Sequence, residues 1–358
     1  MKPSPLLLYA GTYAAENANG VYLYHLDPVS GALTEVGRAQ AGANPSFLTP
    51  HPDGRHLYAV NELTEFQGQP GGAVSALAVD PEAASLSPIN QRASHGTLPC
   101  HLTIDRTAYW LLVANYGNGT LAVYPIEADG SLGPASDVIQ HQGKGLDPQR
   151  QEGPHAHMVN VTPDNRFVLA CDLGIDKLLT YQLDLEKGQL LPHAETVLPP
   201  GSGPRHLDFH PSGKYVYVIN ELSATLMAFT YDTEAGRLNE LQTVPAFPDD
   251  YFGEKAGAEI LVHPSGKFVY STNRGQSNSL AGFAVDESTG RLTLVGHTST
   301  LGRTPRSFVI DPNGRFLLVA NQDSGSLVVF EINIQTGDLS YLSKVNVPAP
   351  TCLMFAPL

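Results

Sequence analysis

Apolar and polar residues alternate in short runs along most of the chain, and turns rich in Gly, Pro and Ser separate these runs. The segment Pro204–Phe209 and the segment Tyr215–Asn220 are a representative pair, joined through the turn Pro211-Ser212-Gly213. Alternation with a period of two on both sides of a Gly-containing turn predicts a β-hairpin. No window shows sustained helical periodicity, so the pattern indicates an all-β fold.

This hairpin frame recurs along the whole chain as a Pro, a second landmark seven residues later and an Asn nine residues beyond that. The complete copies, with some substitutions, are Pro45/Pro52/Asn61, Pro99/Arg106/Asn115, Ala156/Pro163/Asp172, Pro204/Pro211/Asn220, Gly257/Pro264/Asn273 and Pro305/Pro312/Asn321. A last copy begins at Pro350 and ends with the chain, and Leu6–Thr12 has the pattern of its missing strand.

Successive copies are 45 to 57 residues apart. Repeats of roughly 40–50 residues with four strands each are typical of β-propellers. We therefore predict a seven-bladed β-propeller of four-stranded antiparallel blades, with residues 1–358 forming a single domain. The N-terminal strand should close the last blade, because closing the ring removes unpaired strand edges.

The symmetry of each hairpin places two residues of every repeat side by side at its open end. Around Gly213 these residues are Arg205 and Glu221, each eight positions away. Because the first strand of each blade lines the central channel, the equivalent pairs should form a rim around one mouth. The rim pairs are Ser46 with Glu62, Cys100 with Tyr116, His157 with Leu173, Arg205 with Glu221, Ala258 with Arg274, Arg306 with Gln322, and Thr351 with Thr12.

Charged residues dominate this predicted rim. Its cations are Arg205, Arg274 and Arg306, and its groups able to move protons are Glu62, Glu221 and His157, with Glu259 next to a rim position. Arginine binds carboxylate or phosphate through two parallel hydrogen bonds. The rim therefore predicts a site for a small anionic ligand, although its arginines and glutamates could also serve only to pair with one another.

The net charge of −14 argues against nucleic acid or an anionic membrane as a partner. No apolar run approaches the roughly 20 residues of a membrane-spanning helix, and the apolar segment Leu6–Ala10 is short for a signal peptide. Three cysteines without C-x-x-C spacing imply neither a disulfide framework nor a zinc site. We expect a cytoplasmic protein that is a monomer or a weak homo-oligomer.

Other chemistry has less support in the sequence. His155 and His157 could bind a metal together, but no carboxylate has a clear ligand spacing, and we predict neither a metal nor a cofactor. His101 and His206 follow rim positions and are expected to tie blades together. Patterns of serine hydrolases, nucleotide-binding loops and EF-hands are absent from the sequence. The Gln140–His157 stretch, which is the least strand-like, is a candidate functional loop.

Several motifs resemble one known family over essentially the whole chain. They are Gly153-Pro154-His155-Ala156-His157, Pro204-Arg205-His206, Asn220-Glu221, Glu259 and Asn273-Arg274-Gly275. The chain resembles the bacterial propeller-type 6-phosphogluconolactonases, which are related to the fungal carboxy-muconate lactonizing enzymes. The resemblance implies a metal-independent hydrolysis of 6-phosphoglucono-1,5-lactone to 6-phosphogluconate in the pentose phosphate pathway.

In the muconate branch the catalytic set is a His, a Glu and two Arg, which by position are His157, Glu221, Arg205 and Arg274 here. We expect His157 to act as the general base, the arginines to stabilise the oxyanion, and Glu221 to orient His157 or water, with the roles of His157 and Glu221 exchanged as an alternative. The residues expected to bind substrate are Arg306, His155, Glu62, Glu259 and His101. A cycloisomerase, a metal-dependent sugar lactonase and a non-catalytic interaction module remain alternatives.

Overall fold

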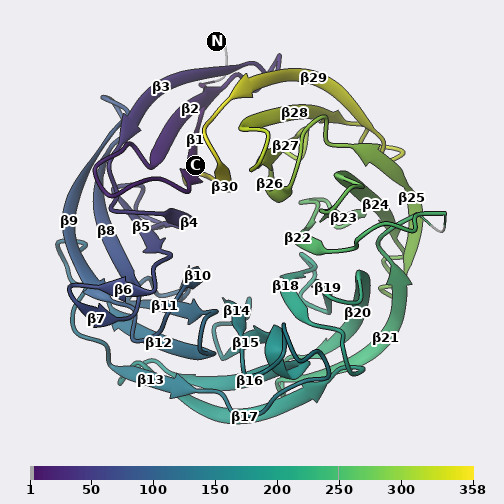
Figure 1. Cartoon of the computed structure of the whole chain (residues 1–358). Helices are drawn as coiled ribbons and strands as arrows, with labels where there is room; N and C mark the ends of the chain where they lie inside the picture. The colour runs from purple at the N-terminus through teal and green to yellow at the C-terminus, as the bar shows by residue number, and fades with distance from the viewer. Residues whose placement is uncertain (1–3, 249) are drawn as a thin grey trace.

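The computed structural model describes residues 4–248 and 250–358. In this part of the chain, seven four-stranded antiparallel sheets surround a central axis (Figure 1). The predicted seven-bladed β-propeller is confirmed. Blades 1 to 6 follow one another along the chain, and each begins with its inner strand.

The strands of each blade follow in order from the axis outward. Blade 1 has β4 (Pro45–Pro50), β5 (His56–Asn61), β8 (Ala73–Asp80) and β9 (Ser85–Ala93), with the small hairpin β6 (Glu65–Phe66) and β7 (Gln69–Pro70) inserted. Blade 2 has β10 (Pro99–Ile104), β11 (Trp110–Asn115), β12 (Thr120–Pro125) and β13 (Asp137–Gln140). Blade 3 has β14 (Ala156–Val161), β15 (Phe167–Asp172), β16 (Lys177–Asp184) and β17 (Gln189–Val197).

Blades 4 to 6 repeat this order. Blade 4 has β18 (Pro204–Phe209), β19 (Tyr215–Asn220), β20 (Thr225–Asp232) and β21 (Arg237–Pro245). Blade 5 has β22 (Gly257–Val262), β23 (Phe268–Asn273), β24 (Ser279–Val285) and β25 (Leu292–Ser299). Blade 6 has β26 (Pro305–Ile310), β27 (Phe316–Asn321), β28 (Ser326–Ile332) and β29 (Leu339–Asn346). The described residues contain one short 3-10 turn, η1 (Leu173–Ile175), and no helix among them has the length and hydrophobicity of a membrane span.

Blade 7 joins the two ends of the chain. Its inner strand is β30 (Pro350–Phe355), and β1 (Leu6–Thr12), β2 (Val21–Leu26) and β3 (Leu33–Ala39) complete it. β1 pairs antiparallel with β30, with Leu8 opposite Phe355. The N-terminal strand therefore closes the ring, as the pattern predicts, and the first and last strands of the described chain are neighbours in one sheet (Figure 1).

The hydrophobic core lies between neighbouring blades, where buried residues of adjacent sheets pack face to face. A hydrogen bond from a buried tyrosine connects the two blades at three of these interfaces. The hydroxyls of Tyr58, Tyr217 and Tyr270 each donate to the carbonyl of a turn glycine in the next blade, at 2.9, 3.0 and 2.8 Å. A buried tyrosine with a satisfied hydroxyl adds apolar contact without an unpaired polar group.

Each inner strand contains an irregularity near its start. In blade 4, Pro204 pairs with Asn220 and His206 with Ile219, so Arg205 is a bulge residue without a partner of its own. Arg205 and Glu221 lie side by side as predicted, with 3.1 Å between Arg205 Nε and Glu221 Oε2, although a bulge keeps Arg205 out of the strand ladder. The register shifts at the corresponding place in all seven inner strands. These shifts fall at the predicted rim positions Ser46, Cys100, His157, Arg205, Ala258, Arg306 and Thr351.

Candidate active site

A cavity of about 210 Å³ lies at the channel mouth where the inner strands begin. β-Bulges re-aim side chains next to functional sites, and several bulge residues reach this cavity. Its lining, which also includes residues that follow the second strands, consists of Glu62, Leu98, Cys100, Tyr116, Arg150, His157, Glu221, Arg274 and Arg306. We call it the mouth cavity. It gathers residues from blades 1 to 6, which are far apart in the sequence.

Glu221 forms ion pairs with three arginines. Its Oε2 lies 2.6 Å from Arg274 Nη2 and 3.1 Å from Arg205 Nε, and its Oε1 accepts a hydrogen bond from Arg150 Nη2. Burial raises the pKa of Glu221, but the charges of Arg274, Arg205 and Arg150 outweigh burial and lower it to about 2. Glu221 is therefore ionised at neutral pH, and its hydrogen-bonding capacity is directed to arginines.

Two of these arginines are anchored by carbonyl groups of the irregular start of β22. Arg205 Nη1 donates to Ala258 O at 2.7 Å, and Arg274 Nη2 donates to Gly257 O at 2.9 Å. The buried Nε of Arg274 has no hydrogen-bond partner among the described residues. An unpaired buried guanidinium donor is costly unless a ligand accepts from it, so this geometry favours an anionic ligand.

His157 is a buried, neutral imidazole at the floor of the mouth cavity. Burial and then the charge of Arg205 hold the pKa of His157 well below its ordinary value, with His206 and two further arginines acting in the same direction. Its Nδ1 lies 3.8 Å from Cys100 Sγ, and its ring meets the Tyr116 ring edge to face at 5.5 Å between centroids. A neutral imidazole retains a lone pair that can accept a proton.

Arg306 and Glu62 form the opposite wall of the mouth cavity. Their ion pair is long, with 3.5 Å between Arg306 Nη2 and Glu62 Oε2. Tyr13 supports both residues, because its hydroxyl donates to Glu62 Oε1 at 2.9 Å and its ring lies 5.4 Å from the Arg306 guanidinium carbon. Arg306 is therefore held in place while much of its hydrogen-bonding capacity remains available.

Arg150 and Tyr116 complete the mouth cavity, and the sequence pattern predicts a functional role for neither of them. Arg150 comes from the loop between β13 and β14, and its Nη2 also donates to the Tyr116 hydroxyl at 3.2 Å. The sequence favours a functional role for this loop as a whole, but no repeat position marks Arg150. Four guanidinium groups against two carboxylates give the site an excess of positive charge, which favours an anion.

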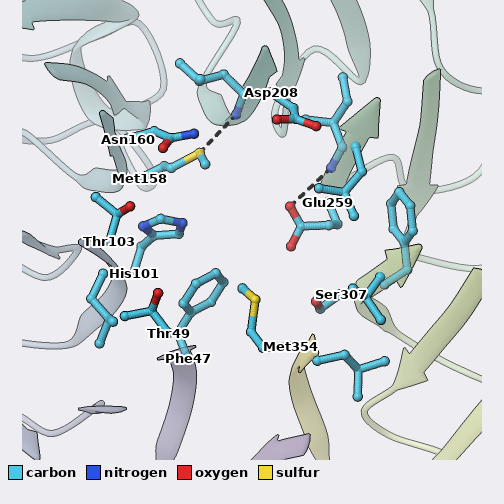
Figure 2. A pocket seen from close by; sticks show the side chains of 17 residues that line it. Phe47, Thr49, His101, Thr103, Met158, Asn160, Asp208, Glu259, Ser307 and Met354 are labelled. Atoms are coloured by element: carbon cyan, nitrogen blue, oxygen red, sulfur yellow. Dashed lines mark hydrogen bonds between the residues drawn. The ribbon is translucent and has the colours of Figure 1, made fainter. Parts of the chain in front are cut away.

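Three of the predicted substrate-binding residues lie outside the mouth cavity. His155 is behind its wall, where its Nδ1 lies 2.8 Å from Tyr116 O and its ring stacks on the Tyr116 ring at 4.6 Å. His101 and Glu259 are deeper in the channel and line a second cavity of about 200 Å³ (Figure 2). We call this the inner cavity. Its other lining residues include Phe47, Met158, Asn160, Asp208, Ser307 and Met354.

His206 connects two blades below the mouth cavity, as the sequence predicts. Its Nδ1 lies 2.6 Å from Glu259 Oε1, which joins β18 to β22. His101 packs on Phe47 with 4.2 Å between ring centroids, and its Nδ1 has no hydrogen-bond partner within the described part of the chain. These residues form a layer between the two cavities.

Two alternative chemistries find no support in this geometry. Burial raises the pKa of the Cys100 thiol far above its ordinary value, so Cys100 is a poor nucleophile. His155 and His157 belong to no group of three clustered metal-ligating side chains in residues 4–248 and 250–358. The Nδ1 of His155 is hydrogen-bonded to a backbone carbonyl.

The fold and the site together define a seven-bladed propeller with a cationic, histidine-containing cavity at one end of its channel. The family model described as lactonase, 7-bladed beta-propeller, matches residues 7–355. The chain therefore belongs to this lactonase family.

Relatives over nearly the whole length agree with this assignment. The 6-phosphogluconolactonase of Bacillus subtilis is 40% identical over 97% of this chain and 97% of its own. The 6-phosphogluconolactonase of Formosa agariphila is 34% identical over 94% of this chain and 95% of its own. The solved structure of the periplasmic gluconolactonase of Pseudomonas aeruginosa matches with a TM-score of 0.93 and 36% identity, covering 99% of each chain.

Proposed function

We propose that this protein hydrolyses 6-phosphoglucono-1,5-lactone to 6-phosphogluconate in the mouth cavity, without a metal ion. The observation that supports it best is the gathering of Arg150, Arg205 and Arg274 around Glu221, next to the neutral His157. Such a site offers a base, fixed positive charge for an oxyanion, and further positive charge for a phosphate. The family membership and the names of the two curated relatives favour the same reaction.

In this proposal His157 accepts a proton from a water molecule as its oxygen attacks the lactone carbonyl. The negative charge that develops on the carbonyl oxygen is stabilised by Arg274, whose Nε lacks a hydrogen-bond partner among the described residues, and by the buried Arg205. The bond between the carbonyl carbon and the ring oxygen then breaks, and the imidazolium returns the proton to the ring oxygen. The product is the open-chain acid, which loses a proton to solvent.

Glu221 has a supporting role in this scheme. A carboxylate with a pKa of about 2 is a poor proton acceptor, so the alternative in which Glu221 is the base is disfavoured. Its contacts are suited to holding the arginines at fixed positions before substrate binds. Of the two expected roles of Glu221, orienting His157 or orienting water, the first is disfavoured, since the ion-pair partners of Glu221 among the described residues are guanidinium groups.

The phosphate would bind to Arg306 with the help of Arg150. Arg306 has a long ion pair with Glu62, and the Arg150 side chain is 42% exposed at the entrance. Arg306 can turn toward a phosphate without losing a short ion pair, and Arg150 can offer donors other than the Nη2 that contacts Glu221 and Tyr116. His155 would act indirectly, by fixing Tyr116, and His101 and Glu259 would have no direct contact with substrate.

A second candidate substrate is unphosphorylated gluconolactone, because the Pseudomonas aeruginosa relative is named a gluconolactonase. A carboxy-muconate lactonizing activity would use the same four residues on a dicarboxylate. A cytoplasmic location and a monomeric or weakly associating state remain predictions.

The deciding experiment is a direct assay of hydrolysis with freshly prepared 6-phosphogluconolactone, gluconolactone and carboxy-muconolactone, each with and without a chelator. We expect the highest kcat/KM for the phosphorylated lactone and no effect of the chelator. Equal rates on the two gluconolactones would remove the phosphate assignment. Activity only on the muconolactone, or complete loss of activity in chelator, would contradict the proposed reaction.

A further inference from the structure

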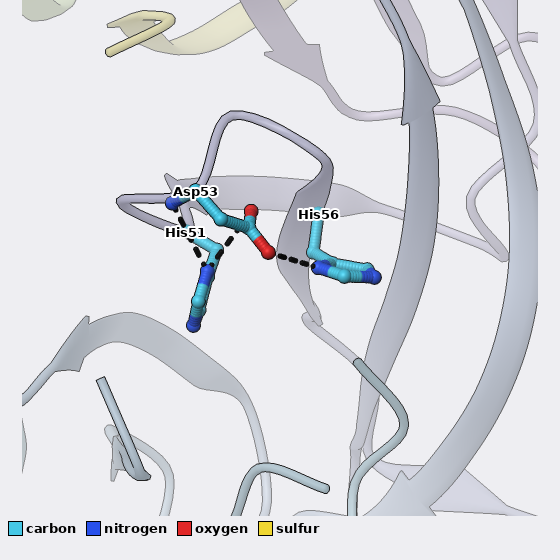
Figure 3. Close-up of side chains that lie close together, drawn as sticks. All are labelled: His51, Asp53 and His56. Carbon is cyan, nitrogen blue, oxygen red and sulfur yellow. Dashed lines mark hydrogen bonds and ion pairs between the residues drawn. The ribbon is translucent and has the colours of Figure 1, made fainter. Parts of the chain in front are cut away.

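The hairpin turn between β4 and β5 carries two histidines and an aspartate that converge on one point. His51, Asp53 and His56 each offer a ligand atom, and these atoms lie within 4.8 Å of one another. Figure 3 shows the two imidazoles directed at the two oxygens of the Asp53 carboxylate. The Nδ1 of His51 is 2.9 Å from Oδ1, and the Nδ1 of His56 is 2.8 Å from Oδ2.

The repeats of the chain provide an internal control for this turn. The turns that begin at His210 and His263 have the sequence His-Pro-Ser-Gly, whereas the first turn is His-Pro-Asp-Gly. In the two Ser turns, the histidine Nδ1 accepts from the amide two residues later at 3.1 Å. The Nε2 lies 3.0 or 2.7 Å from the carbonyl of Gly266 or Gly314 in the next blade. This pattern fixes one tautomer, with the proton on Nε2.

His51 makes the same two backbone contacts. Its Nδ1 lies 3.2 Å from the Asp53 amide, and its Nε2 lies 3.2 Å from Ala108 O in blade 2. The shared geometry assigns His51 the same tautomer, with a lone pair on Nδ1. In the Ser turns a hydroxyl, which can donate a proton, faces this lone pair at 2.7 and 2.8 Å.

In the first turn a carboxylate oxygen replaces that hydroxyl, at 2.9 Å from His51 Nδ1. Two acceptors at this separation repel each other unless a cation lies between them. His56 adds a third ligand atom at the position where the other two turns have Tyr215 and Phe268. The Asp and the second His, which distinguish this turn from its repeats, are therefore the residues that could bind a cation.

We propose that His51, Asp53 and His56 form a binding site for a divalent transition-metal ion of the Zn²⁺ class. Two imidazoles and one carboxylate are ligands that such ions prefer. The contact of His51 Nε2 with Ala108 O is the outer hydrogen bond that metal-binding histidines usually make. An adjoining cavity of about 290 Å³, lined also by Tyr109 and Glu127 of blade 2, leaves room for water or a further carboxylate ligand.

The site is remote from the mouth cavity. β4 runs from Pro45, next to the rim, to Pro50, and His51 follows its far end. Six strand residues span roughly 20 Å, so the ion is structural, and it fixes a turn of blade 1 whose His51 contacts Ala108 O of blade 2. This differs from our sequence-based expectation of no metal, and it leaves the proposed hydrolysis metal-independent.

The test is titration of the metal-stripped protein with ZnCl₂ by calorimetry, supported by the absorption spectrum of bound Co²⁺. We expect one ion per chain. The variants Asp53→Ser and His56→Tyr introduce at both ligand positions the residues of the His210 turn, Ser212 and Tyr215, and are therefore compatible with the fold. Removing an outer hydrogen-bond partner of a metal site costs ~10–100-fold in affinity, so losing a ligand should cost at least about 100-fold.

The reciprocal variant Ser212→Asp combined with Tyr215→His should create a second ion site in blade 4 and raise the stoichiometry to two. Binding by the wild type but equally by the Asp53→Ser, His56→Tyr double variant would overturn the proposal, because the ion would then sit elsewhere. Absence of Zn²⁺ and Co²⁺ binding to the wild type would also overturn it. Lactonase activity should be the same in the metal-stripped, Zn²⁺-loaded and double-variant proteins.

Discussion

Glu221 and Glu259 are equally buried in one channel, with exposed fractions of 5% and 6%, yet their pKa values move in opposite directions. Burial raises the pKa of both carboxyl groups. At Glu221 the charges of three arginines outweigh burial and lower the pKa to about 2. At Glu259 the charge of Arg205 offsets only part of the burial, and the pKa is raised to about 7. The neighbouring charges, and not the degree of burial, therefore decide whether each carboxyl group is ionised.

The same contrast separates the two cavities that these glutamates line. The mouth cavity and the inner cavity have similar volumes of about 210 and 200 Å³. The mouth cavity is bordered by guanidinium groups, whereas the inner cavity has Phe47, Met158 and Met354 beside two carboxyl groups with raised pKa values (Figure 2). Size alone does not distinguish them, but charge makes only the mouth cavity suitable for an anionic lactone.

The strongest test of this contrast is to remove one histidine from each cavity. His157→Ala should lower kcat by about 10²–10⁴-fold, the usual contribution of a general base. His101→Gln, in the inner cavity, should leave kcat within a few-fold of the parent. Steady-state kinetics on 6-phosphogluconolactone, with circular dichroism as a check of folding, provide the comparison. Equal losses in the two variants would show that the cavities do not differ in function.

Substitution of an arginine of the mouth cavity should have the next largest effect on activity. Arg274→Ala removes a donor that we propose stabilises the oxyanion, and it should lower kcat by about 10²–10³-fold. Arg303→Ala is the matched control, since Arg303 is an exposed arginine outside both cavities. Single-turnover rates separate the chemical step from binding. A wild-type rate in the Arg274 variant would exclude this residue from oxyanion stabilisation.

Arg306→Ala should act on binding more than on chemistry. Hydrogen bonds to charged groups contribute about 1.5–3 kcal/mol, so KM for 6-phosphogluconolactone should rise by roughly 10–100-fold. KM for gluconolactone, which lacks the phosphate, should change much less in the same variant. Measuring both substrates with each enzyme isolates the phosphate contact. An equal rise for both lactones would place the phosphate elsewhere.

The repeat explains how much of this could be predicted from the sequence. Period-two alternation and the recurring Pro and Asn landmarks predict every blade, because the same landmarks have the same structural roles. Asn61, Asn115 and Asn273, for example, each donate from Nδ2 to a carbonyl of the segment that leads into the blade. The rim positions follow from the same frame.

Features outside the repeat could not be predicted in this way. The bulge places Glu259 one layer below the rim, and alternation gives no signal for an inserted residue. Arg150 lies on a loop without a counterpart in the other blades, so only the folded chain shows that it pairs with Glu221. The carboxylate at Asp53 is visible in the sequence, but the conflict between its oxygen and the His51 lone pair depends on coordinates.

The smallest expected effect concerns stability, and it tests the glutamate comparison directly. The folded-state pKa of Glu259, about 7, lies above its ordinary value of 4.5. Folding therefore favours the protonated form, and the contribution of Glu259 is fully present below pH 4.5 and is lost as the pH rises through about 7. Glu259→Gln keeps an acceptor for His206 Nδ1 but cannot ionise. By calorimetry, the Tm of this variant should gain on that of the wild type between pH 5 and pH 8, by a few degrees, with kcat within a few-fold. The buried neutral histidines also contribute to stability, and their contribution is lost as the pH falls. Because both proteins contain these histidines, the quantity to measure is the difference in Tm between the variant and the wild type.

Glu221→Gln is the counterpart of this variant, because the stabilising carboxylate of Glu221 has a pKa of about 2. The Tm of Glu221→Gln should fall below that of the wild type throughout this pH range, with no pH trend of its own. A pH-independent gap for Glu259→Gln would mean that Glu259 is ionised in the folded protein, and the distinction between the two cavities would then rest on the arginines alone.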